Sequence, residues 1–368
     1  MKLPTSRDLS KVPTYTPGKS EARVKAEYGL ETVIKLASNE NPLGCSPLAI
    51  RAAQEQLLSS FRYPDHSSDT LRQRLGEHHG LPMDHFIVTA GLEEMINCIG
   101  RAYLLPGDES LIPEISFIKY IISVRLTNSE PVCIPMKDMG IDLDATKARI
   151  TDRTKIIWIA NPNNPTGSYI PAQALMDFLA DIPPHVLVVI DEAYIDFADA
   201  PDFPTGTDRL FETYPQVIIL RTFSKAYGLA DFRIGYAIGL PELLQNVLKV
   251  REIFSVSSLS EAAACGALDD TEFLFRYKKL VHEEKLRIYQ ACDQLAFLGV
   301  DYLKTQANFI YITTPMDSRE LFASLQAKGV IVRPAGAQGI RVTIGLPEEN
   351  DAFLQALEQV LTTNRSQE

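Results

Sequence analysis

Lys225 stands among side chains that could make its amine chemically reactive. It lies in Leu220–Tyr236, LRTFSKAYGLADFRIGY, which reads as strand, loop and strand. Thr222 and Ser224 place hydroxyls beside the lysine, and Arg233 follows it eight residues later. A lysine that loses its proton through burial or a cationic neighbour can form a Schiff base with an aldehyde. Hydroxyls and an arginine nearby suit an aldehyde that also carries a phosphate.

A carboxylate ends the nearly apolar stretch Val186–Asp191, which we expect to be a strand buried on both faces. Asp191 precedes Lys225 by 34 residues, and Tyr194 follows it by three. A buried carboxylate needs a partner, and a protonated pyridine nitrogen would be one. Tyr194 could donate to a phenolic oxygen on the same ring. In isolation, Asp191 would equally suit a helix N-cap.

Two further loops follow expected strands. Gly91, Leu92 and Glu93 open a helix, whose N-terminal N–H groups could hold a phosphate. The rigid loop Asn161–Gly167, NPNNPTG, offers asparagine donors and acceptors, among them Asn164. Each loop alone is compatible with an ordinary turn. Together with the lysine and the carboxylate, they match the parts of pyridoxal 5′-phosphate, whose ring serves as an electron sink.

Strands and helices alternate through the middle of the chain, which predicts an α/β fold with a mainly parallel sheet. Ligands of such sheets bind at the carboxyl ends of the strands, where these loops lie. The expected strands are Phe86–Ala90, Ser110–Pro113, Lys155–Ala160, Val186–Asp191, Val217–Leu220 and Ile234–Ile238, and the helices between them are Leu92–Leu104, Phe117–Leu126 and Pro171–Ala180.

The pattern changes toward the C-terminus, where a long helix over Glu272–Leu295 precedes a small α+β unit. We therefore expect two domains. Residues 1–40 would form an extended N-terminal arm and part of the small domain, residues 41–250 the large domain, and residues 251–368 the small domain.

Composition narrows the classes of protein and partner. The chain of 368 residues has a net charge of −11, which argues against nucleic acid or an anionic membrane as the main partner. Its five cysteines and six histidines lack metal-site spacing, so we expect no metal and reduced thiols in the cytoplasm. We find neither a signal peptide nor an apolar run long enough to span a membrane.

Several strings resemble the fold-type-I pyridoxal-phosphate aminotransferases and, within them, the histidinol-phosphate aminotransferase family. The strings NPNNPTG and SKAYGL are specific for the superfamily, while LASNENPLG near the N-terminus and GIRVTIGLPEEN near the C-terminus favour the family. RYPD and DEAYIDF are also similar. The resemblance covers nearly the whole chain. It implies a large domain with a mainly parallel seven-stranded sheet and a small α+β domain.

The resemblance also implies roles for individual residues. Lys225 would be the Schiff-base lysine and proton shuttle, and Asp191 would pair with the pyridine nitrogen. Tyr194 and Asn164 would hold the phenolic oxygen of the ring. The cofactor phosphate would be held by Gly91, Leu92, Glu93, Thr222, Ser224 and Arg233.

Other implied contacts involve the substrate and a second subunit. Arg341 would clamp the substrate carboxylate, and Asn39 would lie in the active site. Tyr15 and Arg333 would grip a distal phosphate. Tyr63 would reach the cofactor phosphate of the neighbouring subunit, which makes the expected protein a homodimer with shared active sites.

Four features depart from the family pattern. In PEISFIKY the aromatic that should stack on the cofactor comes two residues late, so either Phe117 or Ile115 takes that place, and we favour Phe117. Asp231 and Phe232 occupy a position that is commonly glycine. The segment RPAGAQGIR, residues 333–341, is short, and REIFSVSS lacks a common asparagine.

The expected reaction is transamination between L-histidinol phosphate and 2-oxoglutarate in histidine biosynthesis. The short 333–341 segment leaves two alternatives with the same cofactor, an aromatic amino-acid aminotransferase and a threonine-phosphate decarboxylase. A non-enzymatic effector-sensing module of a regulator fits less well, because a basic DNA-binding region does not precede residue 30.

Overall fold

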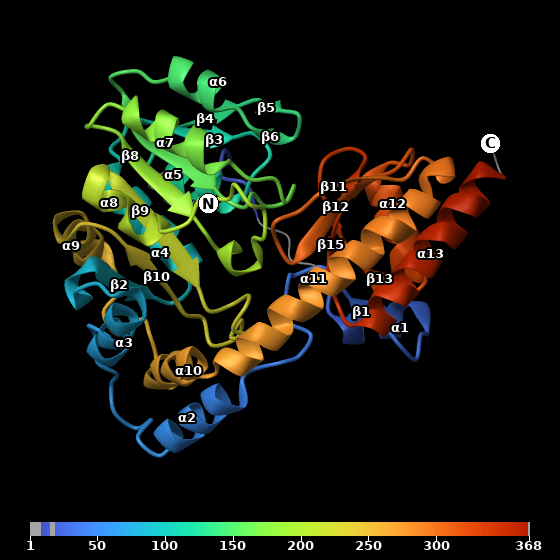
Figure 1. Cartoon of the computed structure of the whole chain (residues 1–368), viewed down its shortest axis with the longest axis horizontal. Helices are drawn as coiled ribbons and strands as arrows, with labels where there is room; N and C mark the ends of the chain where they lie inside the picture. The colour runs from blue at the N-terminus through green and yellow to red at the C-terminus, as the bar shows by residue number, and fades with distance from the viewer. Residues whose placement is uncertain (1–8, 15–18, 367–368) are drawn as a thin grey trace, which may run out of the picture.

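Two main β-sheets, two short two-stranded sheets and the surrounding helices make up the described chain, which in this computed structural model comprises residues 9–14 and 19–366 (Figure 1). The larger sheet has seven strands in the order β2-β10-β9-β8-β7-β3-β4. β10 runs antiparallel to β2 and β9, and the remaining pairs are parallel, which confirms the predicted mainly parallel sheet. The strands are β2 (Phe86–Thr89), β3 (Glu109–Pro113), β4 (Glu130–Ile134), β7 (Thr154–Ala160), β8 (Leu187–Asp191), β9 (Val217–Thr222) and β10 (Gly235–Ile238).

The central strands are apolar on both faces because each face packs against its own core. In β8, Val188 and Ile190 belong to one hydrophobic cluster, whereas Leu187 and Val189 belong to the other. This alternation follows from the two-residue period of a strand. The sheet is therefore a buried layer, and its strand ends are the places where polar groups gather.

Helices cover both faces of this sheet. One face packs against α4 (Leu92–Tyr103), α5 (Lys119–Leu126) and α9 (Pro241–Val250). The other packs against α3 (Asp69–His79), α7 (Ala172–Ala180) and α8 (Leu210–Thr213). Smaller elements of this part are α6 (Leu143–Ala148), β5 (Met136–Lys137), β6 (Gly140–Ile141), and the 3-10 helices Met83–His85, Ile195–Phe197 and Thr207–Arg209.

The smaller sheet is antiparallel, in the order β11-β12-β15-β14. Beside it, β1 near the N-terminus pairs in parallel with β13. The elements of this part of the chain are β1 (Ile34–Lys35), β11 (Asp301–Leu303), β12 (Phe309–Thr313), β13 (Val330–Ile331), β14 (Arg333–Pro334), β15 (Gly339–Thr343), α12 (Ser318–Ala327), α13 (Pro347–Arg365) and the 3-10 helix Ala296–Leu298.

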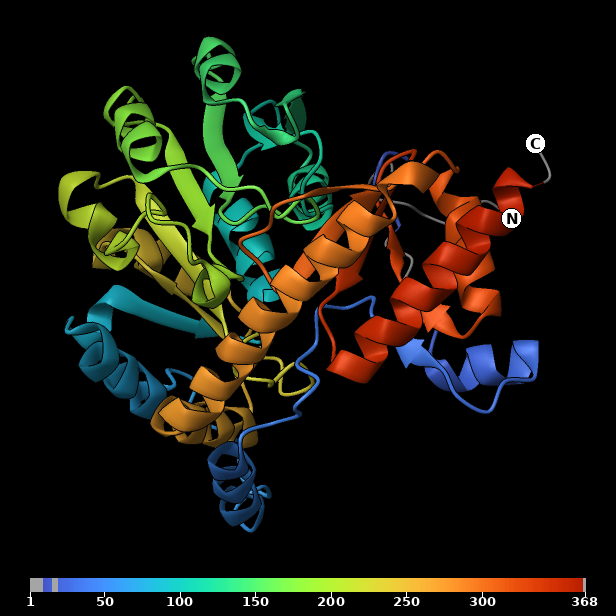
Figure 2. The ribbon, with the colours of Figure 1, turned by 45° about the vertical axis from the view of Figure 1, so that its right-hand side comes forward.

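The long helix α11 (Thr271–Gln294) runs from α10 toward α13 between the two sheets (Figures 1 and 2). Two adjacent residues of this helix make hydrogen bonds to different parts of the structure. Lys285 is buried and donates to Asp199, which follows β8 in the chain, at 2.8 Å. Glu284, also buried, accepts from Asn350 of α13 at 2.7 Å. The helix thus links the ends of β8 and β15.

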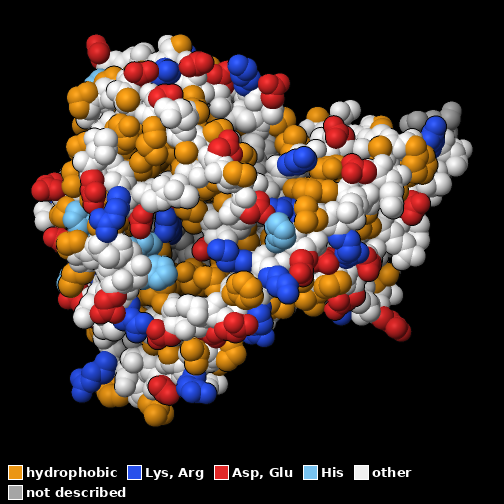
Figure 3. Space-filling model, viewed as in Figure 1, with side chains coloured by type: hydrophobic (Ala, Val, Ile, Leu, Met, Phe, Trp, Pro, Cys, Tyr) orange, Lys and Arg blue, Asp and Glu red, His pale blue; other side chains and the backbone are white. Residues whose placement is uncertain are grey.

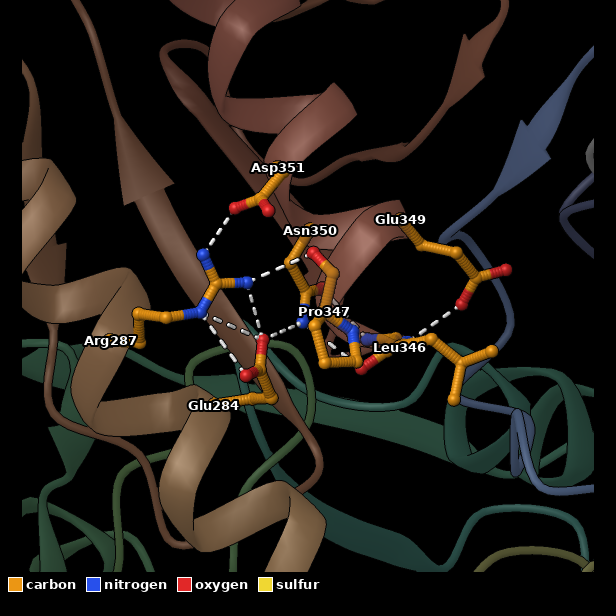
Figure 4. A network of polar contacts seen from close by, with 8 residues as sticks. Glu284, Arg287, Leu346, Pro347, Glu349, Asn350 and Asp351 are labelled. Atoms are coloured by element: carbon orange, nitrogen blue, oxygen red, sulfur yellow. Dashed lines mark hydrogen bonds and ion pairs between the residues drawn. The ribbon is translucent and has the colours of Figure 1, made fainter.

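The anchor at Glu284 is part of a polar network that ties α11 to the turn between β15 and α13 (Figure 4). Arg287 contacts Glu284, Asp351 and the Pro347 carbonyl. Asn350 is fully buried, and its amide bonds both the N–H and the carbonyl of Gly345. The network therefore fixes where β15 ends.

One prediction about local structure was wrong, and one strand was not located. Part of the expected extended arm is the helix α1 (Glu21–Tyr28), which Ser20 caps at its N-terminus and Gly29, at a φ of 66°, at its C-terminus. The resemblance implied seven strands, but the seventh, β4, was not located in the sequence, because Pro131 is typical of a loop. Proline is tolerated there because β4 lies at the edge of the sheet.

Helices α2 (Pro47–Leu57) and α10 (Ser258–Asp269) lie together at the lower end of the molecule in Figure 1. Gly266 allows this close approach, because a Cβ there would lie 2.6 Å from the Leu48 carbonyl oxygen. α10 also contacts α3, which is one of the helices that pack on the larger sheet. The division into domains stays a prediction.

We expect Asn350→Leu to lower the free energy of unfolding by about 2–4 kcal/mol, because it leaves Gly345 and Glu284 buried without their partner. Urea unfolding followed by circular dichroism measures this. Gln355→Met, on the exposed side of the same helix, is the control and should change stability by less than about 0.5 kcal/mol. Equal effects of the two substitutions would contradict the structural role of the network.

Candidate active site

A cavity of about 230 Å³ lies where β7, β8 and β9 end, between the start of α4 and the strand β15. It brings together residues that are up to 304 positions apart in the chain. Its lining comprises Ala37, Ser38, Asn39, Leu92, Glu93, Phe117, Tyr120, Ala160, Pro162, Asn164, Asp191, Ala193, Tyr194, Thr222, Ser224, Lys225, Arg233 and Arg341.

Lys225 reaches this cavity from the loop after β9, and its amine donates to the Ser38 carbonyl at 2.9 Å. Burial is the largest cause, and the positive charge of Arg341 the next, of a pKa for Lys225 that is lowered to about 7. The negative charge of Glu40 raises the pKa of Lys225. A large fraction of the amine is therefore unprotonated near neutral pH, as a nucleophilic lysine requires.

Asp191 lies at the end of β8, where burial raises the pKa of its carboxyl. Its Oδ2 accepts from the Tyr120 hydroxyl at 2.7 Å, and its Oδ1 accepts from the Ala193 N–H at 3.0 Å. Tyr120 is held in turn by stacking on Trp158, with ring centroids 5.0 Å apart. Two donors thus orient the carboxyl in the cavity wall.

Tyr120 was missed by the sequence reasoning. It lies three residues after Phe117, and side chains at that spacing share one face of a helical turn. Phe117 lines the cavity with its ring edge-to-face against Tyr120, with centroids 5.8 Å apart. Ile115 is outside the lining, and its carbonyl accepts from Asn163 at 3.0 Å. The structure therefore places Phe117, not Ile115, at the cavity.

One end of the cavity suits an anion. α4 begins there, with Gly91 at its N-cap and no side-chain cap on its first N–H groups. The Arg233 guanidinium lies against this turn, because a Cβ on Gly91 would be only 2.5 Å from its Nη2. Arg233 also donates to Ser224 Oγ at 3.4 Å, and Thr222 Oγ1 accepts from the Ser224 N–H at 3.1 Å.

The irregular pair Asp231-Phe232 is accommodated by the backbone of Arg233, which has a φ of 49°. The Phe232 carbonyl accepts from the Ser260 hydroxyl at 2.6 Å, which attaches this turn to α10. Arg233 itself donates to the Ala230 carbonyl at 2.8 Å. The turn therefore presents the guanidinium to the cavity although it lacks the usual glycine.

Arg341 and Asn164 meet on the opposite side of the cavity. Arg341 Nη1 donates to Asn164 Oδ1 at 2.7 Å, and its Nη2 donates to the Ala37 carbonyl at 2.5 Å. Asn39 is fully buried nearby, and its Nδ2 donates to the Tyr194 hydroxyl oxygen at 2.9 Å. An arginine from the smaller sheet thus completes a cavity built mainly by the larger one.

Three residues named from the sequence lie outside the lining, and a fourth is not described. Gly91 lies behind the anion end. Arg333 pairs directly opposite Arg341 on the neighbouring strand. Tyr63 is 84% exposed and stacks on Phe254 with centroids 4.9 Å apart. Tyr15 lies outside the described residues.

The described residues contain neither a candidate metal site nor a membrane-spanning helix. Groups of three or more His, Cys, Asp or Glu side chains that could hold a metal ion were not found in this part of the chain. Within residues 9–14 and 19–366, the helices are too short or too polar to cross a membrane.

The seven-stranded sheet and the lysine-bearing cavity at its edge define a fold-type-I transferase. Residues 31–357 match the model of the aminotransferase class I and II family, and the chain belongs to that family.

Relatives refine this placement. The chain is 40% identical to a histidinol-phosphate aminotransferase 2 of Pseudomonas fluorescens over 94% of each sequence. It is 39% identical to a histidinol-phosphate aminotransferase of Moorella thermoacetica, over 98% of this chain and 94% of that one. The crystal structure of histidinol-phosphate aminotransferase from Sinorhizobium meliloti in complex with pyridoxal-5′-phosphate superposes with a TM-score of 0.88, at 26% identity over 98% and 99% of the two chains.

We expect the amine of Lys225 in the cofactor-free protein to gain reactivity as the pH rises through about 7. Arg341→Gln should raise this midpoint by about 0.5–1 pH unit, because it removes a positive charge that disfavours protonation. Pulse acetylation across a pH series, read by peptide mass spectrometry, measures the midpoint. Glu40→Gln should lower it, and Arg319→Gln, at an exposed site, should leave it unchanged. A midpoint insensitive to Arg341→Gln would contradict the assigned cause.

Proposed function

We propose that the protein is a pyridoxal-phosphate-dependent aminotransferase that transfers the amino group of L-histidinol phosphate to 2-oxoglutarate. The observation that carries the proposal is one cavity that holds a lysine of lowered pKa, a buried carboxyl and an anion seat. Membership of the aminotransferase class I and II family and the names of the relatives support the same reaction.

The residues of the cavity fit each part of the cofactor. Arg233, Ser224 and the uncapped start of α4 would hold its phosphate. Asp191 would pair with the pyridine nitrogen, whose positive charge would offset the cost of burying this carboxylate. Asn164 and Tyr194 would face the phenolic oxygen. When bound, the cofactor supplies an aldehyde that captures amines and a ring that takes up an electron pair.

The chain itself must move one proton during the reaction. Lys225 is suited to that task, because an amine with a pKa of about 7 can both accept and release a proton at neutral pH. Asp191 and the anion seat keep the ring in place while the lysine acts. Phe117 forms part of the apolar wall of the cavity.

The substrate is expected to be strongly anionic. Arg333 and Arg341 are directly opposed on antiparallel strands, so their Cβ atoms share one face of the sheet at about 4.5–5.5 Å. Two positively charged side chains that start from one face of the sheet favour a site that receives an anion. Histidinol phosphate lacks a carboxylate, so Arg341 would serve glutamate, and Arg333 with Tyr15 would serve the phosphate.

One observation favours a second candidate, an aromatic amino-acid aminotransferase. The connection between β14 and β15 is short, built of small residues, and pinned by the Tyr311 hydroxyl, which donates to the Ala335 carbonyl at 2.8 Å. Gly339 makes this possible, because a Cβ there would overlap the Tyr311 hydroxyl. If this connection borders the substrate, as the resemblance implies, its shortness would leave room for a bulky ring.

A panel of amino donors should separate these candidates. In single-turnover absorbance assays of the loaded enzyme, we expect L-histidinol phosphate to react faster than phenylalanine or tyrosine. Lys225→Ala should slow the reaction by ~10³-fold or more, because it removes the acid and base of the proton transfer. Lys249→Ala, at an exposed lysine of α9, is the matched control. A preference for aromatic donors would reject the first substrate, and release of carbon dioxide would indicate a decarboxylase.

We also propose a homodimer in which Tyr63 completes the cofactor site of the partner. Apolar side chains are exposed near Tyr63, both after α2 and before α10, namely Leu57, Leu58, Phe61, Ile253 and Phe254. Figure 3 shows apolar side chains at the lower edge of the molecule, over α2. Exposed apolar side chains gathered in one region favour a second protein chain as their cover.

Hybrid dimers test the shared site. We expect Tyr63→Phe to lower activity by roughly tenfold, because it removes a hydrogen bond to a charged phosphate and keeps the apolar ring. Lys225→Ala should be inactive by itself. A co-refolded mixture should be more active than the mean of its parents, because each hybrid contains one intact site. Activity equal to that mean would contradict a shared site.

We infer a cytoplasmic location from the thiols. All five cysteines are unpaired in the structure, two of them buried. Unpaired cysteines are typical of proteins in a reducing compartment.

A further inference from the structure

Asn39 occupies a strained and fully buried position between β1 and α2, with a φ of 55°. This left-handed conformation is uncommon outside glycine and is best tolerated by asparagine and aspartate. The main chain of Asn39 is held on both sides. Its N–H donates to Thr343 Oγ1 at 2.9 Å, and its carbonyl accepts from Asn308 at 3.2 Å. These two hydrogen bonds therefore hold the backbone from which the Asn39 side chain extends.

The Thr343 hydroxyl determines which way the Asn39 amide faces. This hydroxyl accepts the Asn39 N–H, and it donates its own proton to Asn39 Oδ1 at 3.0 Å. With Oδ1 turned toward Thr343, the Nδ2 group faces Tyr194 and donates to its hydroxyl oxygen at 2.9 Å. A reversed amide would remove the acceptor that the buried Thr343 proton has in this arrangement.

This direction has a consequence for Tyr194. Its hydroxyl oxygen accepts the bond from Asn39, so its own proton is directed to another acceptor. The Tyr194 ring lines the cavity and is fixed edge-to-face on Phe309, with centroids 5.0 Å apart. The hydroxyl is thus a donor on a ring that lines the cavity.

We propose that Asn39, locked by Thr343, is a positioning residue that makes the Tyr194 hydroxyl a hydrogen-bond donor to the phenolic oxygen of the cofactor. The inference rests on the proposed function, since that function places the cofactor in this cavity. A donor stabilises the ionised phenolic oxygen, so loss of the donor raises the pH at which the bound cofactor changes its protonation. Asn39 therefore acts through Tyr194 and not by contact with the substrate.

Other charges also face this site and contribute to the same titration. They come from β8, the loop after β9, α4, β15 and the segment after β1. The substitutions below leave all of them in place, so a difference between variants reports the change at Asn39. These groups are Asp191, Lys225, Arg233, Glu93, Arg341 and Glu40.

The test is a pH titration of the visible absorbance of the protein loaded with pyridoxal phosphate, without substrate. Asn39→Asp replaces only the NH₂ group, and the new carboxylate takes the Tyr194 proton, so the midpoint should rise by roughly one pH unit. Asn39→Gly keeps the positive φ without strain or added charge, and its midpoint should also rise. Thr343→Val should act in the same direction, whereas Thr343→Ser, which retains the hydroxyl, should match the wild type.

A double variant separates this effect from the added charge. If Asn39 acts through Tyr194, the double variant Asn39→Gly/Tyr194→Phe, which adds no charge, should titrate like Tyr194→Phe alone. Additive shifts would overturn the inference, as would unchanged midpoints in Asn39→Asp and Asn39→Gly with only a raised KM. If Asn39→Asp does not fold, the midpoints of Asn39→Gly, Thr343→Val and Thr343→Ser test the inference. A wild-type protein that develops no cofactor absorbance would instead refute the proposed function.

Discussion

The arrangement of the cavity depends on the main chain of residues 36–40, which lies between the two main sheets. Five consecutive carbonyls accept hydrogen bonds, and each donor comes from a different residue. Because donors from both sheets converge on one short segment, neither sheet can shift without breaking bonds at the cavity wall. The donors to residues 36, 37, 38, 39 and 40 are, in order, the Thr343 N–H and the side chains of Arg341, Lys225, Asn308 and Tyr277.

Burial moves the two main titratable groups of the cavity toward their uncharged forms. The pKa of Lys225 falls and that of Asp191 rises, in both cases chiefly because water is excluded. The cavity wall also carries Arg233 and Arg341, so with Lys225 its basic residues outnumber its acidic residues, Glu93 and Asp191. An anionic ligand with a protonated ring would relieve both costs at once, which explains why the fold tolerates these groups together.

Much of the site could be predicted because its residues follow strand ends in local patterns. Lys225, Asp191, Asn164 and Arg233 are of this kind, and the structure brings all four to one cavity. The bond from Thr343 to Asn39 spans 304 residues, and such pairings leave no local pattern. Among secondary elements, the capped helix α1 had a readable signal that was overlooked, whereas the edge strand β4, with its proline, had almost none.

The two polar contacts made by adjacent residues of α11 restrict how this helix can move. Glu284 is fastened to α13 and Lys285 to the segment after β8, and neighbouring side chains on a helix diverge by about 100°. Rotation of α11 about its own axis would therefore strain one anchor whichever way it turned. Because the two anchors lie at one level of the helix, they fix its rotation relative to both the start of α13 and the segment that follows Tyr194.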